Sequence, residues 1–347
     1  MNIRDEKQKE AADMIIKYRS GIINAAPRFG KIKTVLDAFK EIKPKKVLVV
    51  YPTNDIKSSW EDEVLLREAV VDIEYVSTVS LKKKIECSYD YIVADEIHDY
   101  SVKELKNLSL IRKKGGELIG LSGTMTNKSF NKISNILRLD VIYRYSIEEA
   151  IKDGILCDYV LNVHQVSLDK EEQWRFNKYN YVRLKLLKEE KPTFNIDLKM
   201  ISFLQKSEAK RKKTIELIEL FKEKRVLVFT GLSVIADSLG IPSYHSRNKN
   251  KELFEAFCKG SGNHLATVRM ADAGVTIKPI NIGILNYFTG SPENTTQKIC
   301  RFLGAEWENP NKVAEIHIIT AYNDFETERL KTALMFLDSE KIRYFKN

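Results

Sequence analysis

The chain has 347 residues, of which 43% are hydrophobic and 30% are charged, and its formal net charge at pH 7 is +9. This composition is typical of a soluble globular protein, and no run of about 18 uncharged apolar residues is present that would predict a membrane span. The length exceeds the roughly 100–200 residues of one domain, so we expect two domains of similar size.

The amino-terminal segment and the cysteines indicate the cellular compartment. Residues 1–15, MNIRDEKQKEAADMI, contain acidic residues and no apolar core, so they resemble neither a secretory signal nor a transit peptide. The four cysteines lie far apart and lack the spacing of a structural zinc site or a redox pair. We therefore expect reduced thiols and a cytoplasmic location.

The first half of the chain alternates short β-branched runs with longer amphipathic segments. The runs predict buried strands at residues 21–26, 46–52, 73–78, 89–96 and 118–124, and the segments between them predict helices, for example at 34–41 and 56–68. Strands that are entered and left through helices form a parallel sheet with both faces covered. The first half is therefore predicted to be an α/β domain.

The second half repeats this pattern. Strands are predicted at residues 225–231, 241–246, 264–270, 282–288 and 314–320. A helix is predicted at 145–153, a mainly helical segment at 170–224 with breaks at Pro192 and Asn195, and a closing helix at 326–345. We expect two α/β domains, residues 1–158 and 159–347, each with a mainly parallel sheet flanked by helices.

The excess positive charge is concentrated in the helical segment. Residues 170–213 contain thirteen Lys or Arg and six Asp or Glu, which fits a solvated helical face or a binding surface for a polyanion such as nucleic acid. Residues 174–188, WRFNKYNYVRLKLLK, interleave aromatic and basic side chains. They are suited either to base stacking with phosphate contacts or to an amphipathic helix that packs through Phe176, Tyr179, Val182 and Leu186.

The segment AAPRFGKIKT, residues 25–34, has features of a phosphate-binding loop. It joins a predicted strand to a predicted helix, whose first amide groups would point at an anion. Lys31 would reach the β- and γ-phosphates of a nucleotide. Ala25 replaces the first glycine of the usual pattern, so the loop by itself is a weak signal.

An acidic pair strengthens this interpretation. The predicted strand at 89–96 ends in Asp95 and Glu96, and carboxylates at the end of a neighbouring strand are what an ATP site with Mg²⁺ needs. Asp95 would hold the metal, directly or through water, and Glu96 would polarise the attacking water. Trp60 and Trp174 fit base stacking as well as ordinary packing.

A series of segments, in this order, resembles the motifs of superfamily 2 (DExH-type) DNA helicases, and of compact phage-type helicases in particular. In the first half the segments are RDEKQKEAADMI (4–15), the loop at 25–34, VLVVYPTNDIKSSW (47–60), DEIH (95–98) and LSGTMTN (121–127). In the second half they are VLVFTG (226–231), LATVRMADAGVTI (265–277) and TTQKICR (295–301).

The resemblance implies two tandem RecA-like domains that bind ATP and Mg²⁺ between them and hold a nucleic-acid strand. The implied nucleotide-binding residues are Gln8, Arg28, Phe29, Gly30, Lys31, Ile32, Lys33, Thr34 and Gly274. The implied catalytic residues are Lys31, Asp95, Glu96, Gln297 and Arg301, with Asp95 as metal ligand and Thr34 as a second candidate ligand. The implied nucleic-acid contacts are Pro52, Thr53, Thr124, Phe229-Thr230, Thr267 and Arg269.

Two departures from the motifs leave two functions open. Ile32 lacks the hydroxyl that normally follows the loop lysine and binds Mg²⁺, and Gly304 occupies the place of the final arginine of the last motif. The chain is therefore either an ATP-hydrolysing helicase that translocates on or remodels DNA, or a degenerate helicase-like protein that binds nucleic acid or a partner with little or no hydrolysis. The expected ligand is single-stranded or branched DNA, with RNA less favoured.

The resemblance also bears on location and partners. A phage-type helicase would work in the cytoplasm of a bacterial or phage-infected cell, with no membrane partner. No accessory domain is evident beyond the two cores, so a protein partner that supplies targeting is expected as well.

Overall fold

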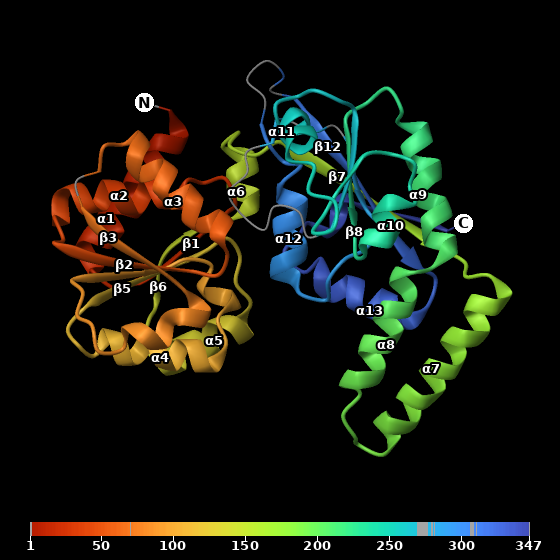
Figure 1. Ribbon diagram of the computed structural model, residues 1–347, viewed down its shortest axis with the longest axis horizontal. Coiled ribbons are helices and arrows are strands. Elements are labelled where there is room, and N and C mark those ends of the chain that lie inside the picture. Colours follow the sequence, from red (N-terminus) through yellow and green to blue (C-terminus); the bar gives the residue numbers. More distant parts are fainter. Residues whose placement is uncertain are drawn as a thin grey trace. The chain divides into compact units, whose positions relative to one another are not determined.

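The computed structural model describes residues 2–69, 71–268, 277–278, 280, 282–305, 309 and 311–346. Residues 2–156 form one compact unit, and the described residues from 157 to 346 form a second. Each unit is a parallel sheet flanked by helices, as in a RecA-like domain (Figure 1). No helix in the described part of the chain is long and apolar enough to cross a membrane.

The first unit contains a six-stranded sheet in the order β3-β2-β4-β5-β1-β6, in which every pair is parallel. Its strands are β1 (Gly21–Ala25), β2 (Lys46–Tyr51), β3 (Asp72–Ser77), β4 (Tyr91–Ala94), β5 (Glu117–Ser122) and β6 (Val141–Tyr145). Its helices are α1 (Ile3–Tyr18), α2 (Lys31–Ile42), α3 (Asn54–Leu66), α4 (Val102–Arg112), α5 (Asn127–Leu137) and α6 (Ile147–Lys152), with 3-10 turns at Thr78–Lys84 and Ile97–Asp99.

The helices of the first unit lie on both faces of its sheet. Figure 1 shows α1, α2 and α3 on one face and α4 and α5 on the other. The central strands are buried on both faces, which explains their continuous apolar sequences. Helix α4 starts with a capping box formed by Ser101 and Glu104, and α6 starts with one formed by Ser146 and Glu149.

The second unit contains a seven-stranded sheet in the order β13-β7-β12-β11-β8-β10-β9. Its strands are β7 (Asp158–Val166), β8 (Val226–Thr230), β9 (Ser243–Tyr244), β10 (His264–Val268), β11 (Ile282–Leu285), β12 (Val313–Ala321) and β13 (Ile342–Lys346). Its helices are α7 (Lys170–Lys188), α8 (Phe194–Gln205), α9 (Glu208–Leu220), α10 (Ser233–Asp237), α11 (Lys251–Cys258), α12 (Pro292–Cys300) and α13 (Asp324–Ala333), with a 3-10 turn at Ser339–Lys341.

The predicted strands of both halves are confirmed, although the one at 241–246 is reduced to Ser243–Tyr244. The single closing helix at 326–345 is wrong: α13 ends at Ala333, and residues 342–346 form β13, which pairs with β7. The edge of β7 offers backbone hydrogen-bond partners to residues 342–346, and the local sequence pattern gives no sign of this distant strand. The break at Asn195 is also wrong, because Asn195 lies inside α8. Strands β6 and β7 were not predicted.

A buried ion pair joins two helices of the second unit. Lys210 Nζ on α9 lies 3.2 Å from Glu326 Oε1 on α13, and both side chains are almost completely buried. Burial lowers the pKa of Lys210, and Glu326 partly offsets this effect. Glu326 also accepts a hydrogen bond from the Ala321 backbone N–H at the end of β12. The carboxylate thereby connects α9, α13 and the sheet.

Glu326→Gln would leave the Lys210 ammonium buried without a counter-charge. We expect the free energy of unfolding to fall by about 3–5 kcal/mol, as for other broken buried pairs, measured by urea denaturation. Glu328→Gln on the same helix is the control, since Glu328 forms an exposed pair with Lys331 and its removal should change stability by less than about 1 kcal/mol. Equal losses in the two variants would contradict the assignment.

Candidate nucleotide site

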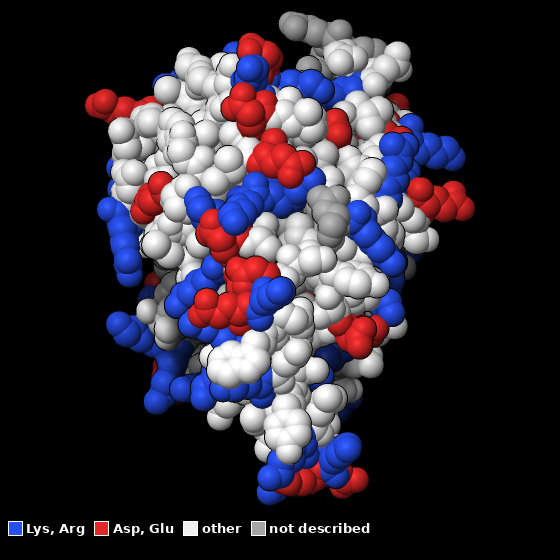
Figure 2. All heavy atoms as spheres, turned by 90° about the vertical axis from the view of Figure 1, so that its right-hand side faces the viewer, with Lys and Arg blue, Asp and Glu red and all other residues white. Residues whose placement is uncertain are grey.

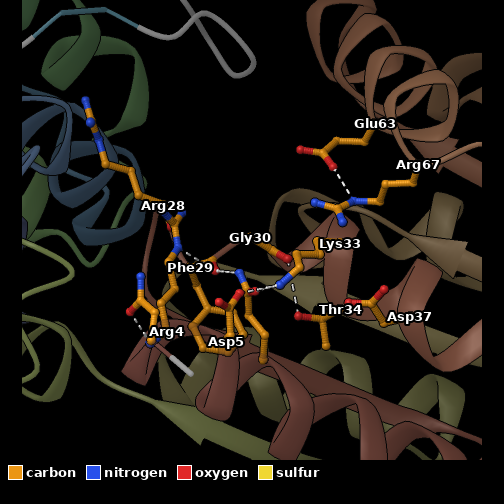
Figure 3. A network of polar contacts seen from close by, with 12 residues as sticks. Arg4, Asp5, Arg28, Phe29, Gly30, Lys33, Thr34, Asp37, Glu63 and Arg67 are labelled. Carbon is orange, nitrogen blue, oxygen red and sulfur yellow. Dashed lines mark hydrogen bonds and ion pairs between the residues drawn. The ribbon is translucent and has the colours of Figure 1, made fainter.

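The loop between β1 and α2 passes very close to α1. Gly30 has a φ of 94°, in the left-handed region, and a Cβ atom at this position would lie 2.3 Å from Gln8 Nε2. Glycine is therefore required both for the backbone conformation and for the space. This close approach brings the loop against the residues of α1 that fix it (Figure 3).

The carbonyl groups of the loop are held by side chains from α1. Gln8 Nε2 donates a hydrogen bond of 2.5 Å to the Phe29 carbonyl, and Arg4 donates to the carbonyls of Phe29 and Arg28. A trans peptide directs its N–H opposite to its carbonyl, so the Gly30 N–H points away from α1. The backbone amides of Lys31, Ile32 and Lys33 follow in the first helical turn, where no intrahelical acceptor exists. Together these groups form a site for an anion.

Phe29 anchors the loop from the other side. Its ring is fully buried, and its centroid lies 5.9 Å from that of Tyr143 and 5.2 Å from that of Tyr145, both on β6. Arg28, which precedes it, has a φ of 65° and a partly exposed side chain. The PRFG sequence thus replaces a glycine-rich loop by one with a buried aromatic anchor.

The first turn of α2 carries Lys31 and Lys33 and no acidic residue. Cations at a helix amino terminus are electrostatically unfavourable unless an anion is bound there. Lys33 is held by Asp5 at 2.7 Å and by Gln8 Oε1. Lys31 Nζ donates to the Ala25 carbonyl at 3.3 Å, at the end of β1. Of the two, Lys31 is the lysine directed along the loop.

Asp95 lies at the end of β4 and is buried. Its Oδ2 accepts a hydrogen bond of 2.8 Å from Trp60 Nε1, and its Oδ1 accepts one of 2.9 Å from the Glu96 backbone. Burial, reinforced by the charge of Glu96, raises the pKa of Asp95 to about 6, and the Lys31 cation acts in the opposite direction. Lys31 Nζ also lies 3.7 Å from the point that a Cβ on Gly123 would occupy.

Three sequence motifs therefore meet at one edge of the first sheet. Lys31 follows β1, Asp95 follows β4 and Gly123 follows β5, and these strands are neighbours in the order β4-β5-β1. Ligands of parallel sheets bind at the carboxyl ends of the strands. The first unit thus holds the expected lysine and carboxylate in one place.

Glu96 and His98 connect the acidic motif to the segment after β5. Glu96 has a φ of 47°, and its Oε2 is buried without a hydrogen-bond partner in the described part of the chain. His98 Nδ1 lies 3.4 Å from that oxygen and 2.9 Å from Ser122 Oγ. Ser122 donates its proton to the Thr124 carbonyl, so His98 Nδ1 is the donor to Ser122.

The position of Thr34 gives no support for its predicted role as a metal ligand. It is fully buried, and its hydroxyl donates a hydrogen bond of 3.2 Å to the Gly30 carbonyl one turn back. Ile32, which is partly buried, has no hydroxyl to replace it. No cluster of three or more His, Cys, Asp or Glu side chains suited to a metal occurs among the described residues. Asp95 is the remaining candidate ligand, and one carboxylate together with nucleotide phosphates is a usual Mg²⁺ environment.

Gln8 has a structural role in this arrangement. Its amide nitrogen donates to Phe29 and its amide oxygen accepts from Lys33. The amide keeps a second N–H donor and a second acceptor site, so contact with an adenine edge would not require either partner to be exchanged. Sequence reasoning missed Arg4 and the tyrosines of β6, and it left Trp60 open between stacking and packing. Trp60 is fully buried and holds Asp95.

The predicted nucleic-acid contacts of the first unit lie at strand ends. Pro52 and Thr53 follow β2, and Thr124 follows β5. The hydroxyls of Thr53 and Thr124 are buried without a hydrogen-bond partner among the described residues. Thr53 is the residue before α3, yet its side chain does not cap that helix. These hydroxyls are therefore not used by the fold.

The second unit contains the remaining predicted residues. Thr230 at the end of β8 donates to the carbonyls of Leu232 and Thr267, while Thr267 Oγ1 is buried without a partner in the described part. Gln297 on α12 also has an unpartnered buried amide nitrogen, and Arg301 directly follows this helix. Arg269 and Gly274 lie outside the described residues.

No protein-family model matches the sequence, and no curated protein matches it. Solved structures of helicases do match the fold. S. cerevisiae Dbp5 bound to RNA and ADP BeF3 aligns over 98% of this chain and 89% of its own, with a TM-score of 0.64 and 10% identity. The helicase domain of Pyrococcus furiosus Hef aligns over 92% and 97%, with a TM-score of 0.55 and 13% identity.

A third structure, the DUF1998 helicase MrfA bound to DNA and AMPPNP, aligns with a TM-score of 0.62 and 13% identity. The alignment includes 96% of this chain and 50% of the MrfA chain. At these identities the similarity shows the fold, which is that of helicases with two tandem RecA-like domains.

Asp95→Asn tests the cost of keeping a carboxylate buried at this edge. Because the folded-state pKa of about 6 is above the ordinary value of 3.8, ionised Asp95 destabilises the fold as the pH rises through this range. Asparagine stays neutral, but its single amide oxygen can replace only one of the two carboxylate oxygens that accept from Trp60 and the Glu96 backbone, a loss that does not vary with pH. The stability of the variant relative to the native protein should therefore rise by about 2–3 kcal/mol between about pH 4 and pH 6 and stay constant above that range.

The measurement is urea denaturation of the protein without nucleotide from pH 4 to pH 8. Asp62→Asn, at an exposed position of α3, is the control and should show no comparable pH-dependent gain. A difference between Asp95→Asn and the native protein that stays constant with pH would refute the electrostatic interpretation.

Proposed function

We propose that this protein is a nucleic-acid-dependent ATPase of the helicase type, which uses ATP and Mg²⁺ to translocate on DNA or remodel it. The observation that carries the proposal is the position of Lys31 beside Asp95 at the carboxyl edge of one parallel sheet. The solved helicases with this fold support it, since their structures contain nucleotide analogues and either RNA or DNA.

Residues of the first unit would bind and orient the triphosphate. The free amides at the start of α2 would hold phosphate oxygens, and Lys31 would neutralise the charge on the β- and γ-phosphates. Mg²⁺, held by Asp95 together with phosphate oxygens, would supply further charge neutralisation. Glu96, whose Oε2 has no hydrogen-bond partner in the described part of the chain, would orient the attacking water.

Residues of the second unit are assigned from the resemblance. Arg301 would stabilise charge on the transferring phosphoryl group, and Gln297 would support hydrolysis through its unpartnered amide. Pro52, Thr53 and Thr124 of the first unit would contact the nucleic-acid backbone, as would Thr230 and Thr267 of the second. Such contacts carry little sequence information, so we expect binding with little sequence preference.

A second candidate function is a degenerate helicase-like protein that binds nucleic acid or a partner with little or no ATP hydrolysis. Specific observations favour it: Ile32 and Gly304 replace expected functional groups, and the Thr34 hydroxyl is buried and bonded to the Gly30 carbonyl. The retained Lys31, Asp95 and Glu96 favour the active enzyme.

ATP turnover with and without single-stranded DNA separates the two functions. We expect DNA-stimulated turnover that falls at least about 100-fold in Lys31→Ala and in Glu96→Gln, because each variant removes a charge or base needed in the transition state. Lys40→Ala, at the exposed end of α2 where it pairs with Asp37, is the control and should leave turnover unchanged. Tight DNA binding without turnover in the native protein would favour the degenerate helicase.

Ile32→Thr tests whether the altered loop limits metal binding. Threonine returns a hydroxyl to the position after Lys31, where such a group normally binds Mg²⁺. The Mg²⁺ concentration for half-maximal ATPase activity should fall several-fold. Ile32→Val has nearly the same shape as the threonine variant and no hydroxyl, so it should behave like the native protein. Identical Mg²⁺ dependence of the threonine and valine variants would contradict the hypothesis.

The proposal has three further parts. The protein prefers DNA to RNA, it acts in the cytoplasm of a bacterial or phage-infected cell, and a protein partner directs it to its target. They rest on the phage-type resemblance of the motifs. A comparison of ATPase stimulation by DNA and RNA strands of equal length tests the first part. Affinity capture from the native host tests the last.

A further inference from the structure

Helices α7 and α8 form an antiparallel hairpin that extends from the second unit, between β7 and α9 (Figure 1). One face of α7 closes a small apolar cluster of its own. Phe176 is buried there, and the cluster is completed by Tyr179, Leu186, Met200, Leu204 and Phe325. An ion pair of 2.8 Å between Arg183 and Asp197 connects the two helices. The hairpin is therefore an ordered element with a defined inner face.

The opposite face of α7 presents large side chains to solvent. Trp174 is 58% exposed and Tyr181 is 72% exposed, although both are large aromatic residues. Val182, predicted to pack inward if the helix were simply amphipathic, is 45% exposed. Together with Asn177 and Lys178 they line an open hollow of about 530 Å³. The packing alternative for residues 174–188 is thus confirmed for Phe176, Tyr179 and Leu186 and wrong for Val182, while the opposite face leaves aromatic and basic side chains exposed.

This outer face is a continuous stripe at helical spacing. Its members, at intervals of three and four residues, are Trp174, Asn177, Lys178, Tyr181, Val182, Lys185 and Lys188. The stripe contains three lysines and no carboxylate. Of the first-turn acids of α7, Glu171 precedes the stripe at the same spacing and pairs with Arg175, and Glu172 accepts from Ser207 and the Glu208 backbone.

The lysines of the stripe have no ionic partner within the described structure. Lys178, Lys185 and Lys188 take part in none of the ion pairs there, and Lys178 Nζ lies 3.4 Å from the Trp174 ring centroid. In Figure 2 the hairpin lies at the bottom of the view, where blue basic side chains, with some red acidic ones at the tip, border white uncharged surface. The stripe therefore combines positive charge with exposed aromatic rings.

We propose that the outer stripe of α7 binds a single-stranded polynucleotide. Aromatic rings accept stacked bases of any type, and lysines between them neutralise phosphates. Trp174 and Tyr181 are seven residues apart, about 10.5 Å along the helix, which equals about three stacking steps of 3.4 Å. The exposed rings suit a protein partner as well, but the three lysines favour the polynucleotide, because lysine is depleted in protein interfaces.

This binding site is separate from the nucleotide loop and lies on an insertion between strands, outside the motif residues. It extends the proposed function by adding a second contact for the same ligand class. Binding through the stripe requires no ATP, so it can be measured independently of hydrolysis.

The test compares the full-length native protein with Trp174→Ala/Tyr181→Ala. Binding of fluorescein-labelled dT20 and rU20 is measured by anisotropy without nucleotide. We expect the double variant to bind at least tenfold more weakly, since stacking on each ring is lost. Tyr322→Ala/Tyr344→Ala removes two rings of similar exposure elsewhere in the second unit and should change the dissociation constant less than twofold. If the double variant loses binding to only one of dT20 and rU20, that result identifies whether the stripe binds DNA or RNA.

A charge variant provides a second measurement that does not depend on the aromatic rings. Lys178→Ala/Lys185→Ala/Lys188→Ala should lower the slope of log binding constant against log salt by about 2, because each phosphate contact in a single strand contributes about 0.7. Quenching of Trp174 fluorescence by dT20, lost in Trp174→Phe, would show direct contact. Unchanged affinity in the aromatic variant together with an unchanged salt slope in the lysine variant would overturn the proposal.

The two proposals fail in different ways. Lys31→Ala should lose ATPase activity and still bind dT20 like the native protein. If the native protein shows no ATPase activity while the stripe variants lose binding, the stripe is correct and the motor function is wrong. If Lys31→Ala loses activity while the stripe variants bind normally, the reverse holds.

Discussion

The electrostatic relation between Lys31 and the buried carboxylate of Asp95 is the interaction on which the candidate site depends. A carboxylate at this depth, next to Glu96, favours the protonated form. Lys31 and Trp60 offset that tendency from two sides. The buried Asp95 carboxylate is stable in its ionised form only when a cation lies close by. A bound metal ion with its triphosphate would meet the same need. The same geometry therefore costs stability and creates a place for ligands.

The loop around Lys31 is fixed from outside rather than by its own sequence. Its carbonyls are held by Arg4 and Gln8, and Phe29 is buried against the tyrosines of β6. A loop with one glycine at its turn is thereby held in a conformation that usually needs several. This arrangement explains how Ala25 and Arg28 are tolerated, and it assigns α1 to the support of the loop.

The second unit shows how one helix can serve two purposes. The inner face of α7 supplies the apolar contacts that order the hairpin, and this allows the outer face to carry exposed rings and lysines without loss of structure. The nearby ion pair of Lys210 with Glu326 fixes α9, the helix that follows the hairpin, to α13 and the sheet. The exposed stripe is thus carried by a firmly attached element.

The sequence alone determined the α/β class, the two series of strands and the identity of Lys31, Asp95 and Glu96 as candidates, because apolar periodicity and short motifs are local properties. Tertiary structure decided what depends on long-range contacts. β13 exists because the edge of β7 is free to pair with it, and the Thr34 hydroxyl is bonded to the Gly30 carbonyl because its turn of α2 is buried. Trp60 holds Asp95 from 35 residues away, and which rings of α7 are exposed depends on where α8 packs. None of these outcomes is encoded in a local pattern, since each requires two distant segments to meet.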